Sequence, residues 1–161
     1  MADYALLLRQ TQALAEDAPA PLAVLANVTA MLWEALPCLN WCGFYLHDGS
    51  QRMVLGPFQG KAACQEIPFG RGVCGTAAAT KQLQLVPDVH AFPGHIACDC
   101  ASNSEIVIPL LLHDQVLGVL DIDSPELGRF TETDAEGLQA IANVLTAALD
   151  WQNGLLGRQR S

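Results

Sequence analysis

Basic residues are scarce in this sequence. Of its 161 residues, 8 are lysine or arginine and 17 are aspartate or glutamate, which gives a formal net charge of −9. The few basic residues form no cluster that would neutralise phosphate groups. We therefore expect no nucleic-acid partner.

Long apolar runs are also missing. The longest, such as residues 106–112 and 116–120, fall far short of the ~18 residues that a membrane-spanning helix needs. The N-terminus carries acidic Asp3 where a signal peptide would be basic, and the apolar stretch after it is short. We expect a cytoplasmic protein that makes no use of a membrane.

Internal repeats, linkers and low-complexity segments are absent as well. At roughly 150 residues per domain, the length predicts a single domain over residues 1–161, with residues 155–161 as a loose tail. Apolar residues make up 51% of the chain, which is typical of a protein with a packed core.

Apolar periodicity predicts helices near both ends of the chain. A short helix is expected over residues 5–15. The next is indicated by apolar residues three or four positions apart, at Leu22, Leu25, Val28, Leu32 and Leu36. A last helix is expected to follow Thr133, to form a capping box with Glu136 and to run to about residue 151. Its apolar face is predicted to comprise Leu138, Ile141, Leu145 and Leu149.

Between these helices the sequence changes to short apolar runs bounded by glycine, proline, asparagine and aspartate. Such runs predict strands, here over residues 41–46, 52–58, 104–112 and 115–122, with one helix near residues 75–81. The predicted fold class is α+β, with a mainly antiparallel central sheet and the N- and C-terminal helices packed on it.

The last two predicted strands form a hairpin that carries three acidic residues. If residues 113–115 form its loop, Glu105 lies opposite Asp123, and Asp121 shares their face of the sheet. A two-residue loop would instead turn Glu105 to the other face. Opposed carboxylates destabilise a sheet unless a cation or a shared proton is present. The alternative is that Asp121 and Asp123 simply end an exposed strand.

Six cysteines are present, at positions 38, 42, 64, 74, 98 and 100. A chain of this length can bury a core without disulfides, so some of these thiols are expected to be chemically active. Cys38 and Cys42 lie beside apolar residues and are expected to be small buried hydrophobes.

Residues 86–103 form the longest segment without periodicity, and long loops of this kind often carry function. The segment contains His90, His95, Cys98, Asp99 and Cys100. One hypothesis is a metal-binding redox switch at His95, Cys98 and Cys100, although a Cys-x-Cys with one histidine matches a zinc site poorly. We expect no metal and no other cofactor.

Gly70, Gly72 and Gly75 fit the pattern G-x-G-x-x-G of dinucleotide sites. That site needs a βαβ unit in a parallel sheet, which this sequence does not predict. We interpret these glycines as backbone turns around Cys74.

The segments between residues 41 and 130 resemble one family closely, the free methionine-(R)-sulfoxide reductases, which are built on a GAF-type domain. The stretches that carry the resemblance are NWCGFYL, LGPFQGKAAC, IPFGRGVCGTA, DVH, GHIACD, ASNSEIVIPL and GVLDIDS. The resemblance implies a GAF-like fold. It also implies reduction of free L-methionine-(R)-sulfoxide to L-methionine, and this stereochemistry comes from the resemblance alone.

Within that resemblance the family's three redox cysteines fall on Cys64, Cys74 and Cys98, with Cys98 as nucleophile. Attack on the sulfoxide sulfur would leave a sulfenic acid, and either Cys64 or Cys74 would resolve it as an intramolecular disulfide. Thioredoxin is the implied reductant. Cys100 departs from the family pattern, and we expect it to be a bystander.

The family's substrate-binding residues fall on Glu105, Asp121, Asp123 and Trp41. One protonated carboxyl would donate to the sulfoxide oxygen, and an ionised neighbour would bind the ammonium of the free amino acid. Trp41 would pack against the methylthio end, or it is a plain core tryptophan. The sequence does not identify the proton donor.

Two further expectations remain. Homodimerisation is common for this fold. The alternative from another functional class is a non-catalytic GAF sensor of a small ligand. Such sensors carry output domains, for which the sequence after the last predicted helix leaves little room.

Overall fold

The computed structural model describes residues 1–18, 20–95 and 100–158. Its helices are α1 (Tyr4–Ala15), α2 (Pro21–Ala35), α3 (Gly72–Thr80) and α4 (Glu132–Ala148), with 3₁₀ turns at Val89–Ala91 and Trp151–Asn153. Its strands are β1 (Trp41–His47), β2 (Arg52–Gly60), β3 (Glu66–Pro68), β4 (Gln84–Val86), β5 (Ser104–Leu112) and β6 (Gln115–Ser124). The short strands β3 and β4 were not predicted.

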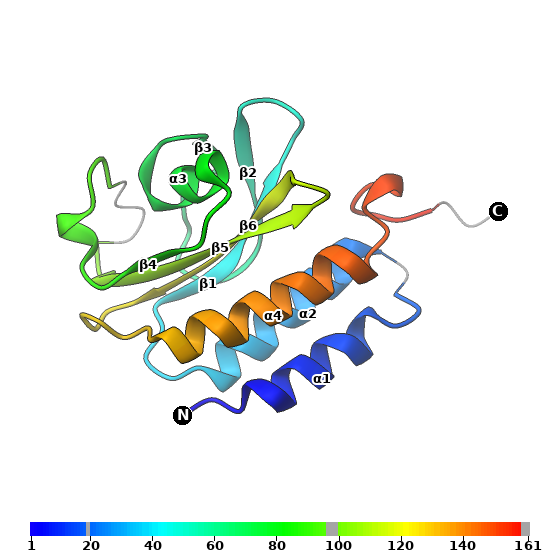
Figure 1. The fold of residues 1–161 in the computed structure, drawn as a ribbon, viewed down its shortest axis with the longest axis horizontal. Helices are drawn as coiled ribbons and strands as arrows, with labels where there is room; N and C mark the ends of the chain where they lie inside the picture. The colour runs from blue at the N-terminus through cyan, green and yellow to red at the C-terminus, as the bar shows by residue number, and fades with distance from the viewer. Residues whose placement is uncertain (19, 96–99, 159–161) are drawn as a thin grey trace.

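The strands form one six-stranded sheet in the order β3-β2-β1-β6-β5-β4, and every pairing in it is antiparallel. Helices α1, α2 and α4 lie together on one face, and α3 covers the other (Figure 1). This arrangement confirms the predicted α+β fold with an antiparallel sheet and terminal helices.

Each face of the sheet has its own core. Phe44, Ile108 and Leu120 point toward α2 and α4, whereas Tyr45, Val107 and Val119 point toward α3. Because side chains alternate along a strand, β1, β5 and β6 are apolar on both faces and read as nearly continuous apolar runs.

The apolar faces of the two long helices are largely as predicted. In α2, Leu25, Val28 and Leu32 are fully buried, whereas Leu22 is only half-buried. In α4 the predicted residues Leu138, Ile141, Leu145 and Leu149 are all buried.

The predicted capping box of the last helix is wrong by two residues. Thr131, and not Thr133, is the N-cap, and its partner is Asp134 in place of Glu136. The helix ends at Ala148, three residues before the predicted end. The Asp134 carboxylate accepts from the Thr131 amide and also from Tyr4 and Arg129, and these hydrogen bonds hold it at the start of the helix.

The predicted three-residue loop between β5 and β6 is also wrong. His113 and Asp114 alone form the turn, both in the left-handed region with φ of 49° and 66°, as a type I′ turn requires. Leu112 then pairs with Gln115, but a bulge restores the expected register, so that Leu110 pairs with Gly118 and Glu105 with Asp123. The extra residue is in strand β6 and not in the turn.

The far end of the chain contacts the rest of the molecule. Leu155 packs against the core on the helix-covered face of the sheet, and its carbonyl oxygen accepts a 3.0 Å hydrogen bond from the Leu22 amide. The assignment of residues 1–161 to one domain stays a prediction, as does the loose tail, whose last three residues lie outside the described part. Among the described residues, no helix combines the length and hydropathy needed to cross a bilayer.

Candidate active site

Three adjacent strands bring the predicted site residues into one row on the face covered by α3. Trp41 of β1 pairs with Asp123 of β6, and Asp123 pairs with Glu105 of β5. Asp121 lies two residues before Asp123 and therefore on the same face. The predicted gathering of the three acidic side chains is confirmed, and they do not end an exposed strand.

A cavity lies between this row and α3. The three carboxyl groups line it together with Trp41 and Cys74. Cys74 reaches it because α3 packs its Ala-rich face against the sheet, where Ala77 and Ala78 are almost fully buried. The helix thus places a thiol directly above two carboxyl groups.

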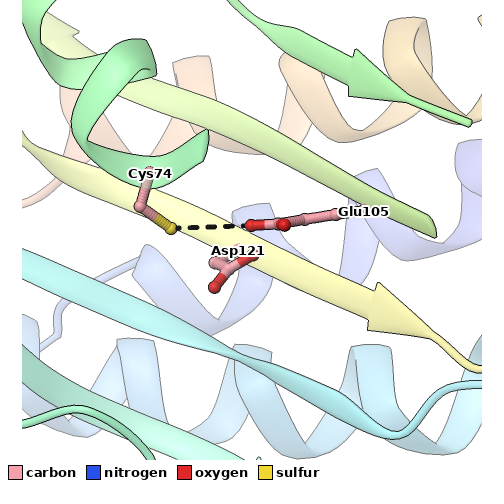
Figure 2. A group of neighbouring side chains, drawn as sticks. All are labelled: Cys74, Glu105 and Asp121. Carbon is pink, nitrogen blue, oxygen red and sulfur yellow. Dashed lines mark hydrogen bonds between the residues drawn. The ribbon is translucent and has the colours of Figure 1, made fainter. Parts of the chain in front are cut away.

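Cys74, Glu105 and Asp121 form a buried cluster in which the three side chains point toward one another from α3, β5 and β6 (Figure 2). Their exposed fractions are 4%, 6% and 6%, and the Cys74 thiol donates a 3.9 Å hydrogen bond to Glu105 Oε1. Within the described part of the chain, Asp121 Oδ1 has no hydrogen-bond partner.

Burial and mutual repulsion hold protons on this cluster. Burial, together with the charges of Asp121 and Asp123, raises the pKa of Glu105 well above its usual value. Burial raises the pKa of Asp121 to about 6, although hydrogen bonds from Glu105 and Cys74 lower it in part. At neutral pH Glu105 is therefore the protonated partner, and it donates to Asp121.

Cys74 itself is held as a thiol. Burial, followed by the charges of Asp121 and Glu105, raises the pKa of Cys74 well above its usual value. Because the thiolate is the nucleophilic form, Cys74 is poorly suited to initiate attack.

Aromatic side chains form one wall of the cavity. Trp41 stacks on Tyr45 at 5.7 Å and on Phe58 at 5.3 Å between ring centroids, and its indole N–H donates to the Lys61 carbonyl. Trp41 is thus a core residue that also lines the cavity. Tyr45 was not singled out from the sequence, although its position four residues after Trp41 on one strand places both on the same face.

Tyr45 links this wall to the predicted redox cysteines. Its hydroxyl donates a 2.8 Å hydrogen bond to the Cys64 carbonyl oxygen. Cys64 takes part in a disulfide, whereas Cys38, Cys42, Cys74 and Cys100 are free thiols. Cys98 lies outside the described residues.

The remaining cysteines are placed differently. Cys42 is fully buried in the core toward the helices, as predicted. Cys38 is exposed, so its prediction as a buried hydrophobe is wrong: it lies on the turn before β1, where its backbone is left-handed with φ of 60°. Cys100 is exposed.

His95, which the sequence suggested only as a possible metal ligand, also lies at the cavity. It is half-buried, lines the cavity and places Nε2 4.0 Å from Glu105 Oε2. Burial and the nearby His90 lower its pKa. His90 itself is exposed and pairs with Asp88, away from the cluster.

The glycines of the G-x-G-x-x-G pattern form a turn at the start of α3. Gly70 and Gly72 have φ of 81° and 64°, and the Gly70 amide donates to the Gly75 carbonyl. A side chain at position 75 would clash with the Pro68 carbonyl oxygen. Their interpretation as backbone turns around Cys74 is confirmed.

Comparison with known proteins places this arrangement in context. The GAF domain model matches residues 20–149. A protein of Escherichia coli named free methionine-R-sulfoxide reductase is 55% identical over 146 residues, which cover 91% of this chain and 88% of that protein.

Two solved structures agree with this relative. The reduced form of fRMsr of Staphylococcus aureus superimposes with a TM-score of 0.89 at 47% identity, covering 93% of this chain and 97% of that one. Free methionine-R-sulfoxide reductase of Neisseria meningitidis, solved with its substrate, gives 0.85 at 48% identity and covers 89% and 86%.

Proposed function

Because the chain belongs to the GAF-domain family of free methionine-R-sulfoxide reductases, we propose that it reduces free L-methionine-(R)-sulfoxide to L-methionine. The observation that carries the proposal is the carboxyl of Glu105, which is buried in a cavity beside an aromatic wall and two further acids, where burial and their charges raise its pKa. Reduction of a sulfoxide requires such a proton donor, since the sulfur–oxygen bond breaks readily only when its oxygen is protonated.

Cys98 is the proposed nucleophile. Its thiolate attacks the sulfoxide sulfur while Glu105 gives its proton to the oxygen. The oxygen ends on Cys98 as a sulfenic acid, and methionine leaves. The high pKa of Cys74 supports this choice because a buried protonated thiol is a weak attacking group.

Cys64 is the proposed resolving residue. Its thiol displaces water from the Cys98 sulfenic acid and forms a disulfide, and thioredoxin returns both sulfurs to thiols with two electrons and two protons. This choice is supported by the engagement of Cys64 in a disulfide while Cys74 remains free.

The acidic row accounts for a preference for the free amino acid. Asp123 and Asp121 are the proposed partners of the substrate ammonium, which a peptide-bonded residue lacks. Trp41 is the proposed contact for the methylthio group, because its indole face lies in the same row as Asp123.

The test is consumption of NADPH coupled through thioredoxin reductase and thioredoxin. We expect turnover of free L-methionine-(R)-sulfoxide, none with the (S) epimer or a peptide-bonded sulfoxide, and loss of turnover in Cys98→Ser. Absence of turnover with every sulfoxide, in protein that is folded, would overturn the proposal and favour a GAF sensor of a small ligand.

Two carboxyl variants separate proton donation from substrate binding. Glu105→Gln should lower kcat by about 10²–10⁴-fold, the usual contribution of a general acid. Asp123→Asn should mainly raise KM, by roughly tenfold to a hundredfold for one lost charged hydrogen bond. Glu34→Gln, an exposed change on α2, is the control.

Disulfide mapping by mass spectrometry tests the cysteine roles. After substrate without reductant, we expect Cys98 joined to Cys64 in the unmodified chain and in Cys74→Ser. A dominant bond from Cys98 to Cys74 or Cys100 would contradict the assignment of Cys64.

A cytoplasmic location, a homodimer and one domain over residues 1–161 complete the proposal. Size-exclusion chromatography with light scattering tests the homodimer.

A further inference from the structure

The cluster of Cys74, Glu105 and Asp121 offers one thiol and two carboxyl groups. One ligand atom from each lies within 4.8 Å of the others. We propose that these three residues form an inhibitory binding site for zinc.

The ligand set fits zinc. Zinc binds thiolate, imidazole and carboxylate in tetrahedral sites, at about 2.3 Å to sulfur and 2.0–2.2 Å to oxygen. Those bond lengths place a sulfur and an oxygen ligand about 3.6 Å apart. Cys74 Sγ and Glu105 Oε1 are 3.9 Å apart, so a shift of a few tenths of an ångström brings both onto one ion.

The surroundings of Asp121 also favour a bound cation. Its side chain is more than nine-tenths buried and points into the cluster (Figure 2). Asp121 accepts hydrogen bonds from Glu105 and Cys74, but its Oδ1 atom has no hydrogen-bond partner among the described residues. A buried carboxylate oxygen in this state is destabilising, and a bound cation would satisfy it.

A tetrahedral zinc ion needs a fourth ligand, and the cavity offers one. His95 Nε2 lies 4.0 Å from the second oxygen of Glu105, so this imidazole or a water molecule would complete the tetrahedron. Asp123, on the same row, adds negative charge, whereas Arg71 at the cavity wall opposes it.

Zinc here would occupy the groups assigned above to the substrate. This consequence rests on the proposed function, and it predicts that zinc raises the apparent KM for free methionine sulfoxide with little change in kcat. The metal site itself is tested by binding alone, so the two proposals fail separately.

Binding is measured on the full chain carrying Cys38→Ser and Cys100→Ser, which removes the two exposed free thiols. The protein is first oxidised so that Cys64 is held in its disulfide, and thiol counting confirms two remaining thiols, Cys42 and Cys74. Zinc is titrated against a chromophoric chelator. Cadmium replaces it as a spectroscopic probe, because a thiolate ligand gives an ultraviolet charge-transfer band.

We expect one zinc per chain and a cadmium–thiolate band. Cys74→Ser should abolish the band and weaken zinc binding at least tenfold, and Asp121→Asn should weaken it similarly. Cys42→Ser, which removes the other buried thiol, should change neither. Zinc binding absent from the oxidised protein, or lost in Cys42→Ser but retained in Cys74→Ser, would overturn the proposal.

The outcome does not depend on the folding of one variant. If Cys74→Ser unfolds, as judged by circular dichroism, the cadmium band of the parent protein and the higher cadmium concentration needed to form it in Asp121→Asn decide the case. A band that persists unchanged in Asp121→Asn would assign the thiolate ligand to another site.

Discussion

Asp121 illustrates how one buried side chain couples the chemistry of the site to the stability of the molecule. Its pKa is about 6 in the folded protein, against 3.8 for an ordinary aspartate. The native state therefore binds more protons than the unfolded state between about pH 4 and pH 6. The free energy of unfolding accordingly falls as the pH rises through this window, and the raised pKa of Glu105 extends the fall to higher pH.

Replacement of Asp121 by asparagine should remove the part of this pH dependence that Asp121 contributes. A shift of about two pKa units corresponds to roughly 3 kcal/mol. We expect Asp121→Asn to gain stability relative to the parent chain, by up to about that amount, as the pH rises from 4 to 7. Urea denaturation at several pH values measures the difference. Glu34→Gln should run parallel to the parent, and parallel curves for Asp121→Asn would contradict the prediction.

At the scale of elements, the start of α4 distinguishes two cap assignments. Thr131 accepts from the Asp134 amide, and Asp134 accepts from the Thr131 amide. We expect Thr131→Ala to lower the free energy of unfolding by about 1 kcal/mol, the usual cost of losing an N-cap. Thr133→Ala, two residues away and also at an exposed position, should change it little. Chemical denaturation of both variants decides between the caps, and equal effects would argue against the Thr131 box.

Also at the scale of elements, strand β6 packs closely against β1 beside its bulge. Gly118 faces the Tyr45 carbonyl oxygen so closely that a Cβ atom would overlap it. Gly118→Ala should therefore destabilise the protein by roughly 1–3 kcal/mol, the range for overpacking a filled core. Thermal unfolding followed by circular dichroism measures the loss. An unchanged melting temperature would contradict the close contact between position 118 and the Tyr45 carbonyl oxygen.

At the scale of the whole molecule, α1 and α4 pack against each other and are joined by a hydrogen bond. Tyr4 of α1 donates a 2.6 Å hydrogen bond to Asp134 of α4, 130 residues later in the sequence. Its ring lies where a Cβ atom on Gly137 would be. Position 137 therefore favours glycine, although alanine is the better helix former.

This contact predicts that Gly137→Ala changes the free energy of unfolding in opposite directions with and without the Tyr4 ring. Gly137→Ala should destabilise the parent chain because it displaces the Tyr4 ring. In a Tyr4→Ala background the same change should stabilise, by up to about 1 kcal/mol, since only helix propensity remains. A double-mutant cycle by chemical denaturation measures the coupling. The same sign in both backgrounds would show that the ring does not occupy that space.

Much of the fold was predictable because local patterns determine it. Strand β5 was predicted with its observed limits, and the apolar faces of α2 and α4 follow from the spacing of their leucines. The strands β3 and β4 were missed because each has three residues, too few for an alternation to be visible. The cap of α4 was misplaced because Asp134 is also held by Tyr4, which is 130 residues away in the sequence.

The candidate site was likewise predictable only in part from the sequence. The sequence by itself determined that Asp121 and Asp123 share one face, because side chains alternate with period two along a strand, whereas the face of Glu105 depended on the length of the turn. The sequence placed the extra residue in the turn, whereas the structure has it in a bulge, and both arrangements produce the same register.

Only the tertiary structure decided what lies above that face. Packing of α3 against the sheet brings Cys74 onto the carboxyl groups, and burial from both sides holds protons on Glu105 and Cys74. Residue type and spacing along one strand carry no information about such contacts, because they join segments 31 residues apart and depend on how closely a helix approaches a sheet.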